Sequence, residues 1–496
     1  MLKIRQIKYS KGSCSVQVYK IKNRKRIIVR HIGTARTAED LSRLLSLATD
    51  FIDKSSKQLR MFEDRYSNIG LALSDLEFIG VYYSFFYDTM HKILLDIGFD
   101  KLQQAFLLDL AVIRIFEPSS KLRSIELLEE YFGIKHRRQK FYDLAPGWLE
   151  LKDKAERIAV DFAQSEYQFD YHLVFYDVTT LYFESFQEDG FRKNGFSKDN
   201  KSQQPQILVA LMVSKEGLPV SYEVFEGNIF EGHTFIPSIE HFIKKNQVKT
   251  LTVIADAAMI SAENSHALQS SGLNYIVGAR LANLPQSLLD EISQKLGIED
   301  GNTIRIKTDN GDLICGFSSL RFRKDKHEMQ KQIQRAELLI NNPGKRKKYK
   351  FTKSVGESLA LNEKLITKAT KLLGVKGYYT NLPEKEVSDK MIIERYSELY
   401  RIEQAFRMAK SDLQTRPIFH FKEEPIKLHL LICFIALFTS KHIELKTGSS
   451  IKNFLHEAKK ITDARLKSNS TAKVYIKRAL LNPKIEGLLE KLNLLT

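Results

Sequence analysis

The sequence predicts a multidomain α/β protein, and three observations support this expectation. The chain has 496 residues, which suggests about three domains at roughly 150 residues each. Hydrophobic residues make up 43% and charged residues 28%, so disorder throughout is excluded. The hydrophobic period is helical over much of residues 61–165 and changes, over residues 166–280, to strands that alternate with helices.

The first two regions each have one dominant pattern. Residues 1–60 form a small basic unit, in which the alternating runs SVQVYKI and KRIIVRHIG predict short strands. A helix is expected to follow them, from about Thr37 to Phe51. This unit either contacts DNA or presents a solvated basic face. Residues 61–165 predict a packed helical domain, which we expect to bind DNA.

Residues 166–280 predict the first part of a catalytic core built on a mixed sheet. LVFYDV and TLTVIAD read as buried strands, because they are short and almost continuously apolar. Lys215–Gly217 predicts a hairpin turn between two further strands. Ser261 predicts the N-cap of a helix, and NYIVGAR predicts another strand.

The remaining regions alternate between basic and apolar. Residues 281–375 are expected to form an inserted basic subdomain, since residues 321–350 hold 11 lysines and arginines against 3 acids. Residues 376–445 should form the second part of the core, with a long helix from about Ser388 to Ser411 and a buried helix over 425–445. Residues 446–496 predict a basic helical tail.

The charge favours a polyanionic partner. The formal net charge is +17, which suits nucleic acid or an acidic membrane face. The longest apolar run, Leu430–Phe438, is too short to span a bilayer, and the N-terminal residues lack an apolar signal core. We therefore expect a cytoplasmic protein without a membrane partner. The widely spaced cysteines predict neither a disulfide framework nor a zinc site: Cys14, Cys315 and Cys433.

Two aspartates follow the buried runs of the expected sheet. Asp177 ends LVFYDV, and Asp256 ends TLTVIAD. If the two strands are neighbours, both carboxylates lie at one region of the sheet, where ligand sites form in α/β folds. Two carboxylates repel, and a divalent cation such as Mg²⁺ or Mn²⁺ relieves the repulsion. The alternative for each residue is an aspartate that caps a turn.

A third acid, Glu403, lies on the expected long helix. Helical spacing places it on one face with Tyr396, Arg407 and Lys410. Above the sheet, Glu403 would complete a three-carboxylate site, and Arg407 and Lys410 could bind phosphate. Such an arrangement suits phosphoryl transfer with two cations. The alternative is a surface helix with a Glu403–Arg407 ion pair.

Further basic residues are candidates for contacts with DNA. Lys198 follows Asp177 and could approach DNA or lie in a solvated loop. The run KRKKYK is either a DNA contact or a charged loop, and its candidate residues are Lys345, Arg346 and Lys347.

The ordered set of motifs resembles the DDE transposases of bacterial insertion sequences. Their signature Y-x2-R-x3-E-x6-K is matched by Tyr396, Glu403 and Lys410, with Leu399 in place of the arginine. The segments IEQAFRMAKSDLQTRPIFHF and GFSKDNKSQQPQILVALMVSKEGLPVSYEVFEGN are also similar to these proteins. The resemblance covers about residues 170–445.

The resemblance implies an RNase H-like core with an inserted subdomain. It implies that Asp177, Asp256 and Glu403 are catalytic and bind two Mg²⁺ ions, or Mn²⁺ in their place. Such enzymes cleave DNA at terminal inverted repeats and join the 3′ ends to target DNA, generally as homodimers. We therefore expect a nucleoid-associated bacterial enzyme. The alternatives are an RNase H-like nuclease without strand transfer and a DNA-binding protein whose active site has decayed.

Overall fold

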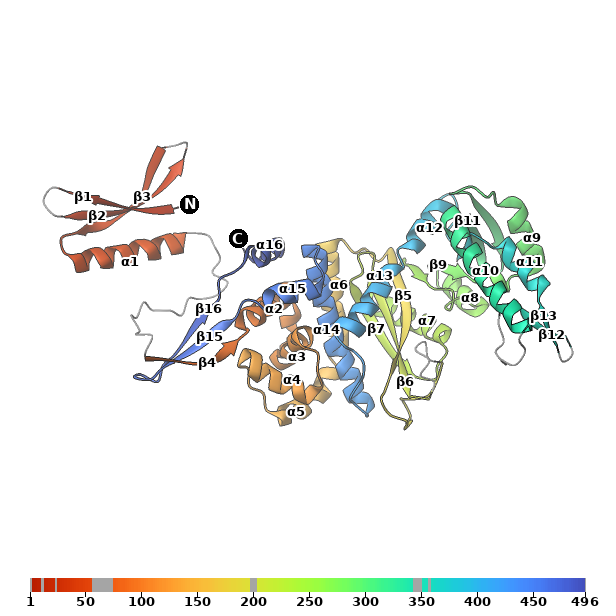
Figure 1. The fold of residues 1–496 in the computed structure, drawn as a ribbon, viewed down its shortest axis with the longest axis horizontal. Helices are drawn as coiled ribbons and strands as arrows, with labels where there is room; N and C mark the ends of the chain where they lie inside the picture. Colours follow the sequence, from red (N-terminus) through yellow and green to blue (C-terminus); the bar gives the residue numbers. More distant parts are fainter. Residues whose placement is uncertain are drawn as a thin grey trace. The chain divides into compact units, whose positions relative to one another are not determined.

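The computed structural model divides the chain into two compact units (Figure 1). The terminal unit is Met1–Thr89 with His456–Thr496, and the central unit is Met90–Leu455. The structure describes residues 2–9, 13–22, 25–55, 75–196, 203–341, 350–355 and 358–495.

The terminal unit begins with an antiparallel three-stranded sheet covered by one helix. The strands are β1 (Leu2–Lys8), β2 (Cys14–Lys22) and β3 (Lys25–Ala35), and the helix is α1 (Ala38–Ser55). Apolar residues alternate along β2, so Val16 and Val18 face Ala48 of α1 and form a small core. The expected strands and helix of this region are confirmed.

A second sheet of the terminal unit joins distant parts of the sequence. Its order is β16–β15–β4, all antiparallel, and α16 follows it. The expectation of a helical tail was wrong, because residues 463–478 hold two strands, and the mostly helical region begins with a strand that was not expected. Local periodicity could not reveal the sheet, because β4 needs a partner almost 400 residues away. The bounds are β4 Leu76–Tyr82, β15 Asp463–Ser468, β16 Val474–Arg478 and α16 Pro483–Lys491.

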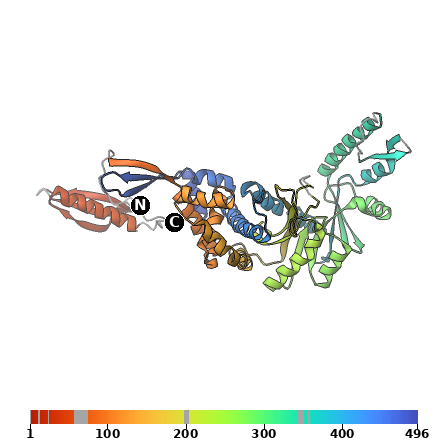
Figure 2. The ribbon, with the colours of Figure 1, turned by 90° about the horizontal axis from the view of Figure 1, so that it is seen from below.

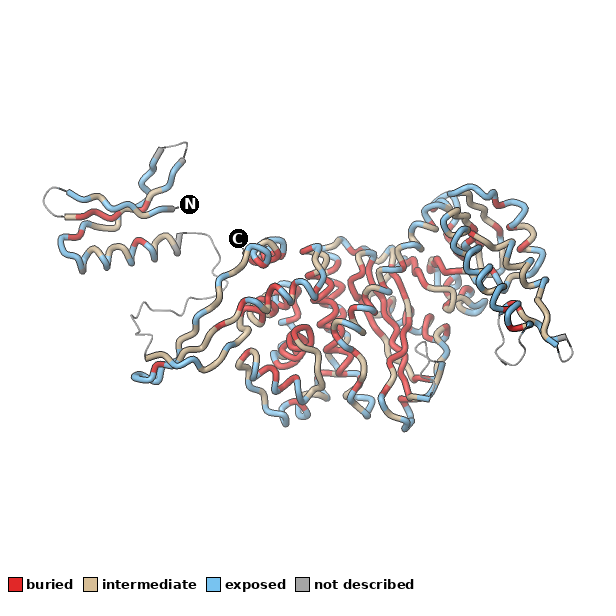
Figure 3. Tube along the Cα trace, viewed as in Figure 1, coloured by how far each residue is buried: buried red, intermediate tan, exposed pale blue. Residues whose placement is uncertain are grey.

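The helical part of the central unit packs around one apolar helix, α14 (Glu423–Thr447). Among the described residues α14 alone is long and apolar enough to cross a membrane, but 94% of its most apolar window is buried inside the protein. Figure 3 shows α14 and α3 as mostly buried. The other helices are α3 Ala105–Phe116, α4 Lys121–Leu127, α5 Arg138–Leu149 and α6 Lys152–Tyr167. The boundaries between the two units fall within α2 (Ser84–Ile97) and α15 (Ile451–Ala458).

A mixed sheet of eight strands forms the rest of the core, in the order β10-β11-β14-β9-β8-β5-β6-β7. The pairs β5–β8 and β8–β9 are parallel and the others are antiparallel. The predicted buried strands and the hairpin between β6 and β7 are confirmed. The bounds are β5 Leu173–Tyr182, β6 Gln206–Ser214, β7 Pro219–Glu226, β8 Thr252–Ala255, β9 Asn274–Ala279, β10 Thr303–Thr308, β11 Gly311–Phe317 and β14 Val375–Thr380.

Helices cover both faces of this sheet (Figure 2). On one face lie α7 (Phe235–Asn246) and α8 (Ala262–Ser270), whose N-cap Ser261 accepts a hydrogen bond from the Asn264 N–H as the sequence predicts. The other face carries the segment that was expected to be one long helix. It is broken at residues 398–399 into α12 (Asp389–Ser397) and α13 (Tyr400–Arg407), and a single π-turn, Met408–Asp412, follows.

The region between residues 281 and 375 contributes to the main sheet. Its strands β10 and β11 pair onto β14 and extend the sheet by two strands. The helix α10 (Ser319–Asn341) and a small hairpin project from that end of the sheet (Figures 1 and 2). The remaining elements are α9 Gln286–Lys295, β12 Thr352–Val355, β13 Ser358–Leu361 and α11 Glu363–Lys371.

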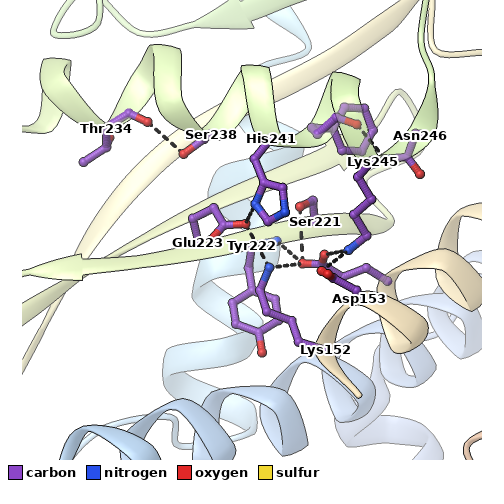
Figure 4. Close-up of polar contacts among 12 residues, drawn as sticks. Lys152, Asp153, Ser221, Tyr222, Glu223, Thr234, Ser238, His241, Lys245 and Asn246 are labelled. Atoms are coloured by element: carbon purple, nitrogen blue, oxygen red, sulfur yellow. Dashed lines mark hydrogen bonds and ion pairs between the residues drawn. The ribbon is translucent and has the colours of Figure 1, made fainter. Parts of the chain in front are cut away.

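A buried ion-pair network fixes the β7 edge of the sheet (Figure 4). Glu156 of α6 is 1% exposed and accepts a hydrogen bond from the Tyr222 N–H of β7 at 2.9 Å. Its carboxylate also pairs with Lys152, at 3.1 Å, and with Lys245 of α7. Because a buried carboxylate is tolerated only when it is paired, this network ties α6, α7 and β7 together.

Candidate active site

Asp177 and Asp256 lie side by side on the sheet. In the parallel pair β5–β8, Tyr176 is opposite Ala255, so the next residue of each strand is one of the two aspartates. Adjacent strands are about 4.8 Å apart. The two strands are therefore neighbours, which is the condition that the sequence analysis set for the two carboxylates to lie together. Asp177 lies inside β5, which continues along β6, whereas Asp256 directly follows the last residue of β8.

The two faces of β5 have different roles. The Tyr176 hydroxyl is 2.7 Å from the Thr234 hydroxyl, on the side that α7 covers. Side chains alternate along a strand, so Asp177 points to the opposite side, where α13 packs against β5 and β6. Thr179 also faces that side, where it lines a cavity with Phe406 of α13. Asp177 is thus presented to the segment that carries Glu403.

Backbone hydrogen bonds orient both aspartates. Oδ1 of Asp177 accepts from the Val178 N–H at 2.7 Å, and Oδ1 of Asp256 accepts from the Ala258 N–H at 2.7 Å. The second bond is the turn cap that was the alternative explanation for Asp256. Capping and ligand binding are compatible, because a carboxylate has two oxygens and about four acceptor positions.

Tyr396 lies within electrostatic reach of all three acids. Burial raises the pKa of its phenol, and the negative charges of Asp256, Asp177 and Glu403 raise it further. All three carboxylates therefore lie within electrostatic reach of one phenol. Tyr396 belongs to α12 and Glu403 to α13, so the break in the predicted long helix separates these two signature residues.

Gly278 of β9 makes room for this tyrosine. Gly278 lies in the row that contains the aspartates, because Val277 is opposite Ala255 in the parallel pair β8–β9. A Cβ atom on Gly278 would be 2.5 Å from the Tyr396 hydroxyl. The Tyr378 ring, opposite Gly278 on β14, has its centroid 4.7 Å from the centroid of the Tyr396 ring. The hydroxyl is thus held directly above the strand next to Asp256.

The residue that departs from the signature has an apolar environment. Leu399, which replaces the signature arginine, lies at the start of α13 and is only 8% exposed. It lies in the interruption between α12 and α13, where its side chain is buried. A buried leucine needs no ionic partner, so the departure from the signature leaves no unpaired charge.

The other predicted basic residues are dispersed. Arg407 is exposed at the end of α13, and Lys410, in the π-turn, lines the cavity that Phe406 and Thr179 border. Four candidates lie outside the described residues: Lys198, Lys345, Arg346 and Lys347.

Two basic residues near the acids were missed by the sequence analysis. Burial lowers the pKa of Lys376, and so does the positive charge of Arg321, whereas Glu403 and Asp325 act in the opposite direction. Lys376 of β14 and Arg321 of α10 are therefore close to one another, and Lys376 is within electrostatic reach of Glu403. The sequence offered one signal for Lys376, namely that it is a lysine inside the otherwise uncharged strand VKGYYT.

The carboxylates fit a divalent cation only in part. Two carboxylates in register on neighbouring strands are the hard oxygen donors that Mg²⁺ and Mn²⁺ prefer. Within the described ranges, however, no three His, Cys, Asp or Glu side chains are grouped closely enough to hold a metal ion. Asp177 and Asp256 thus lie side by side, and Glu403, exposed on α13, lies outside that pair.

Comparison with known proteins identifies related sequences over this region. Residues 168–439, which include all three acids, match the family model described as Transposase DDE domain. No curated protein matches the chain. A solved structure of piggyBac transposase, a synaptic complex with hairpin DNA, is similar over 58% of this chain with 9% sequence identity and a TM-score of 0.35. The chain spans about half, 51%, of that transposase.

Proposed function

The chain belongs to the Transposase DDE domain family, and from this membership we propose that it is a DNA transposase that moves its own insertion sequence. It cleaves the DNA at the ends of the element and joins the freed 3′ ends to target DNA. Both reactions are phosphoryl transfers in which an oxygen, of water or of a 3′-hydroxyl, attacks a phosphodiester. The central unit is in this proposal an RNase H-like core with an inserted subdomain.

One observation carries the proposal, namely that Asp177 and Asp256 lie side by side on the sheet while Glu403 is within electrostatic reach of the same phenol, that of Tyr396. Asp177 and Asp256 are in register on neighbouring parallel strands, and together with Glu403 they raise the pKa of that phenol. A concentration of negative charge beside DNA is unfavourable unless cations neutralise it. The positive charges of Lys376 and Arg321 lie on the same side and suit the phosphate backbone of a bound strand.

We assign the divalent cations to Asp177, Asp256 and Glu403. When bound, two Mg²⁺ ions, or Mn²⁺, would supply the Lewis acidity that activates the attacking oxygen and stabilises the leaving oxygen. Asp177 and Asp256 hold their orientation through the backbone hydrogen bonds described above. Glu403 completes the set when DNA is bound, and the break between α12 and α13 is where the chain would adjust.

The remaining assignments concern partners. The substrates are double-stranded DNA with terminal inverted repeats and a target DNA, and a homodimer would bring two ends together. Arg407 and Lys410 would contact phosphates beside Glu403, and the basic run that contains Lys345, Arg346 and Lys347 would contact DNA farther from the acids, as would Lys198. We place the enzyme in the bacterial cytoplasm, on the nucleoid.

The test uses the full chain, Mg²⁺ and DNA that carries the element's own ends. We expect nicking at the ends and joined products from the natural protein. Asp177→Asn, Asp256→Asn and Glu403→Gln should each lower cleavage by at least about 100-fold, because each removes charge from the cation site. All three variants should still bind the ends. Asp161→Asn, at an exposed position of α6, is the matched control and should cleave normally.

The outcomes separate the proposal from its alternatives. Cutting without joined products would identify a nuclease without strand transfer. End binding without cutting, in the natural protein and in the variants alike, would identify a DNA-binding protein without catalysis. Normal cleavage by any of the three acid variants would contradict the assignment of that acid.

Removal of metal gives a second, independent prediction. We expect a chelator to abolish cleavage and strand transfer while end binding persists, and excess Mg²⁺ or Mn²⁺ to restore both reactions. Calorimetric titration with Mn²⁺ should detect binding to the natural protein and a loss of affinity in Asp177→Asn. Unchanged activity in the chelator would contradict the metal assignment.

A further inference from the structure

A polar pocket lies in the central unit, away from the three acids. It is small and is lined by residues of α3, α4, α5, α14 and the loop of residues 413–422. Five of its lining residues carry polar side chains, and no Asp or Glu is among the described residues that line it. These five are Arg114, Lys121, Ser124, His420 and His429.

Arg114 is unusual for its position. It belongs to α3, whose other buried side chains are almost all apolar, and is itself 7% exposed. Its Nη2 atom donates to the Ser119 carbonyl oxygen at 2.8 Å. Its Nε atom is buried and has no hydrogen-bond partner among the described residues. A buried guanidinium without a carboxylate is costly, and a bound anion would remove that cost.

The other basic groups add to the positive potential. The Lys121 ammonium lies 4.1 Å from the centroid of the Phe141 ring and 4.3 Å from that of Tyr142, so it is held by aromatic faces. His429 is within hydrogen-bond distance of the Thr415 carbonyl oxygen, 3.1 Å from its Nε2. The centroids of the His420 and His429 rings are 5.9 Å apart. Four cationic or protonatable side chains thus converge on one small space.

The electrostatics of the histidines reflect this concentration. Burial lowers the pKa of His420 to about 4, and the charges of Lys121 and Arg114 contribute to the shift. Burial also lowers the pKa of His429 well below its ordinary value, with contributions from Arg114 and His420. No carboxylate of the described residues is among the groups that shift the pKa of either ring, so the positive charges of Arg114 and Lys121 act there without a nearby negative charge.

We propose that this pocket binds a phosphate group. A phosphate offers oxygens to the Arg114 Nε–H, to the Lys121 ammonium and to the His420 ring, and its negative charge compensates the cations. The phosphate is either free inorganic phosphate or a phosphodiester of a DNA backbone, and the two sources share the same chemistry.

The loop gives the pocket a connection to the catalytic segment. Residues 413–422 link the π-turn that follows α13 to α14, and His420 of this loop faces the pocket. Arg416 of the same loop lies over the ring of Tyr182, at the end of β5, with 5.3 Å to the centroid. An anion that contacts His420 therefore holds the loop that follows the Glu403-bearing helix.

The first measurement uses inorganic phosphate and the full chain. At constant ionic strength, phosphate should bind by calorimetry and raise the melting temperature, with chloride as the comparison. Arg114→Gln and His420→Gln should weaken this binding at least tenfold. Lys140→Gln, at an exposed position of α5, is the matched control and should bind normally. His420 is only half-buried, so its variant remains informative if Arg114→Gln fails to fold.

The second measurement distinguishes the two sources. The salt dependence of DNA binding is compared for the natural protein, Lys121→Gln, His420→Gln and the Lys140→Gln control. If the pocket holds a DNA phosphate, its variants should lose about one from the slope of log K against log salt while the control keeps the natural slope, because one phosphate contact is removed. Unchanged slopes, in variants that bind free phosphate more weakly, would identify a site for free anion.

The proposal is overturned if the natural protein binds no phosphate and the pocket variants keep the natural DNA slope. It is equally overturned if the natural protein binds phosphate and both Arg114→Gln and His420→Gln bind it as tightly as the natural protein does. The phosphate measurement requires no transposase activity, so its failure is distinguishable from failure of the proposed function.

Discussion

At the scale of single residues, small side chains and backbone groups decide where the charged ones can act. Gly278 leaves the space that the Tyr396 hydroxyl occupies, and the N–H groups of Val178 and Ala258 orient the two aspartates. None of these groups carries charge. They determine, nevertheless, how closely the acids and the phenol approach.

Gly278→Ala tests this packing. The new Cβ would be 2.5 Å from the Tyr396 hydroxyl and would also crowd the Ala257 nitrogen, at 3.2 Å, so the tyrosine must move. We expect cleavage to fall at least tenfold and the stability to drop by about 1–3 kcal/mol, the usual range for overpacking. Cleavage assays and thermal unfolding measure the two effects. Gly190→Ala, where a Cβ meets nothing within 4 Å, should change neither, and equal behaviour of the two variants would contradict the packing argument.

His442 predicts a pH dependence of stability. Burial, with a contribution from Lys446, lowers its pKa to about 4, and its Nδ1 is 2.8 Å from the Tyr167 hydroxyl. In the unfolded chain this ring is protonated near the ordinary histidine pKa of 6.5, so the unfolded state binds more protons between pH 6.5 and pH 4. Stability therefore falls as the pH falls through that window, by about 2 kcal/mol between pH 7 and pH 5 from this residue.

Denaturant unfolding at several pH values measures the effect. His442→Gln should flatten the dependence, although the buried His420 and His429 contribute in the same direction. A His442→Gln curve parallel to that of the natural protein would contradict the assignment. His241→Gln is the control, since 44% of that side chain is exposed.

At the scale of elements, the network around Glu156 holds α6 and α7 against the β7 edge of the sheet. The Glu156 carboxylate of α6 accepts a hydrogen bond from the Tyr222 N–H of β7 and forms an ion pair with Lys245 of α7 (Figure 4). Burial opposes the charge of Lys152, but Glu156 and Glu223 prevail and raise its pKa. Three elements are thereby joined through one carboxylate.

Removal of that carboxylate should destabilise the central unit. Glu156→Ala leaves Lys245, whose side chain is 7% exposed, without its buried partner. We expect a loss of about 3–5 kcal/mol, as for other broken buried pairs. Asp153→Ala removes an ion pair of the same lysine at a position that is 61% exposed and should cost about 0–1 kcal/mol. Chemical unfolding of both variants measures the difference, and equal losses would contradict the role of burial.

Some elements and positions in the fold could be predicted from the sequence, and others could not. The positions of Asp177 and Asp256 were predictable, because each follows a short apolar run and parallel strands bring such positions together. The break at residues 398–399 was not, since helical spacing continues across it. The strands β4 and β15 were also missed, because pairing between distant segments leaves no local period. That Lys376 lies within electrostatic reach of Glu403 depends on the order of the strands, which spacing alone does not give.

At the scale of the whole molecule, the charge of +17 is combined with a small acidic centre. Basic residues border the acids at Lys376 and Arg321 and line the phosphate pocket at Arg114 and Lys121. In the proposed function these cations bind the phosphate backbone and release its counterions. Affinity for DNA should therefore depend strongly on salt.

We expect end binding to weaken by about 10³–10⁵-fold between 50 and 200 mM salt, which corresponds to 6–10 phosphate contacts. Equilibrium binding at several salt concentrations gives the slope. The acid variants Asp177→Asn and Asp256→Asn should keep the slope of the natural protein, because they remove no cation. A slope near zero would contradict a phosphate-based interaction.

The sheet of β4, β15 and β16 determines how late in translation the terminal unit can finish folding. The Ser468 hydroxyl donates to the Asp75 carboxylate at 2.6 Å, and 393 positions separate the two residues. At about 5–20 residues per second, a ribosome needs roughly 20–80 seconds to cover that distance. During this interval β4 has emerged and β15 has not been made. The central unit can fold while the chain is still being synthesised, but this sheet of the terminal unit must wait for the last stage of translation.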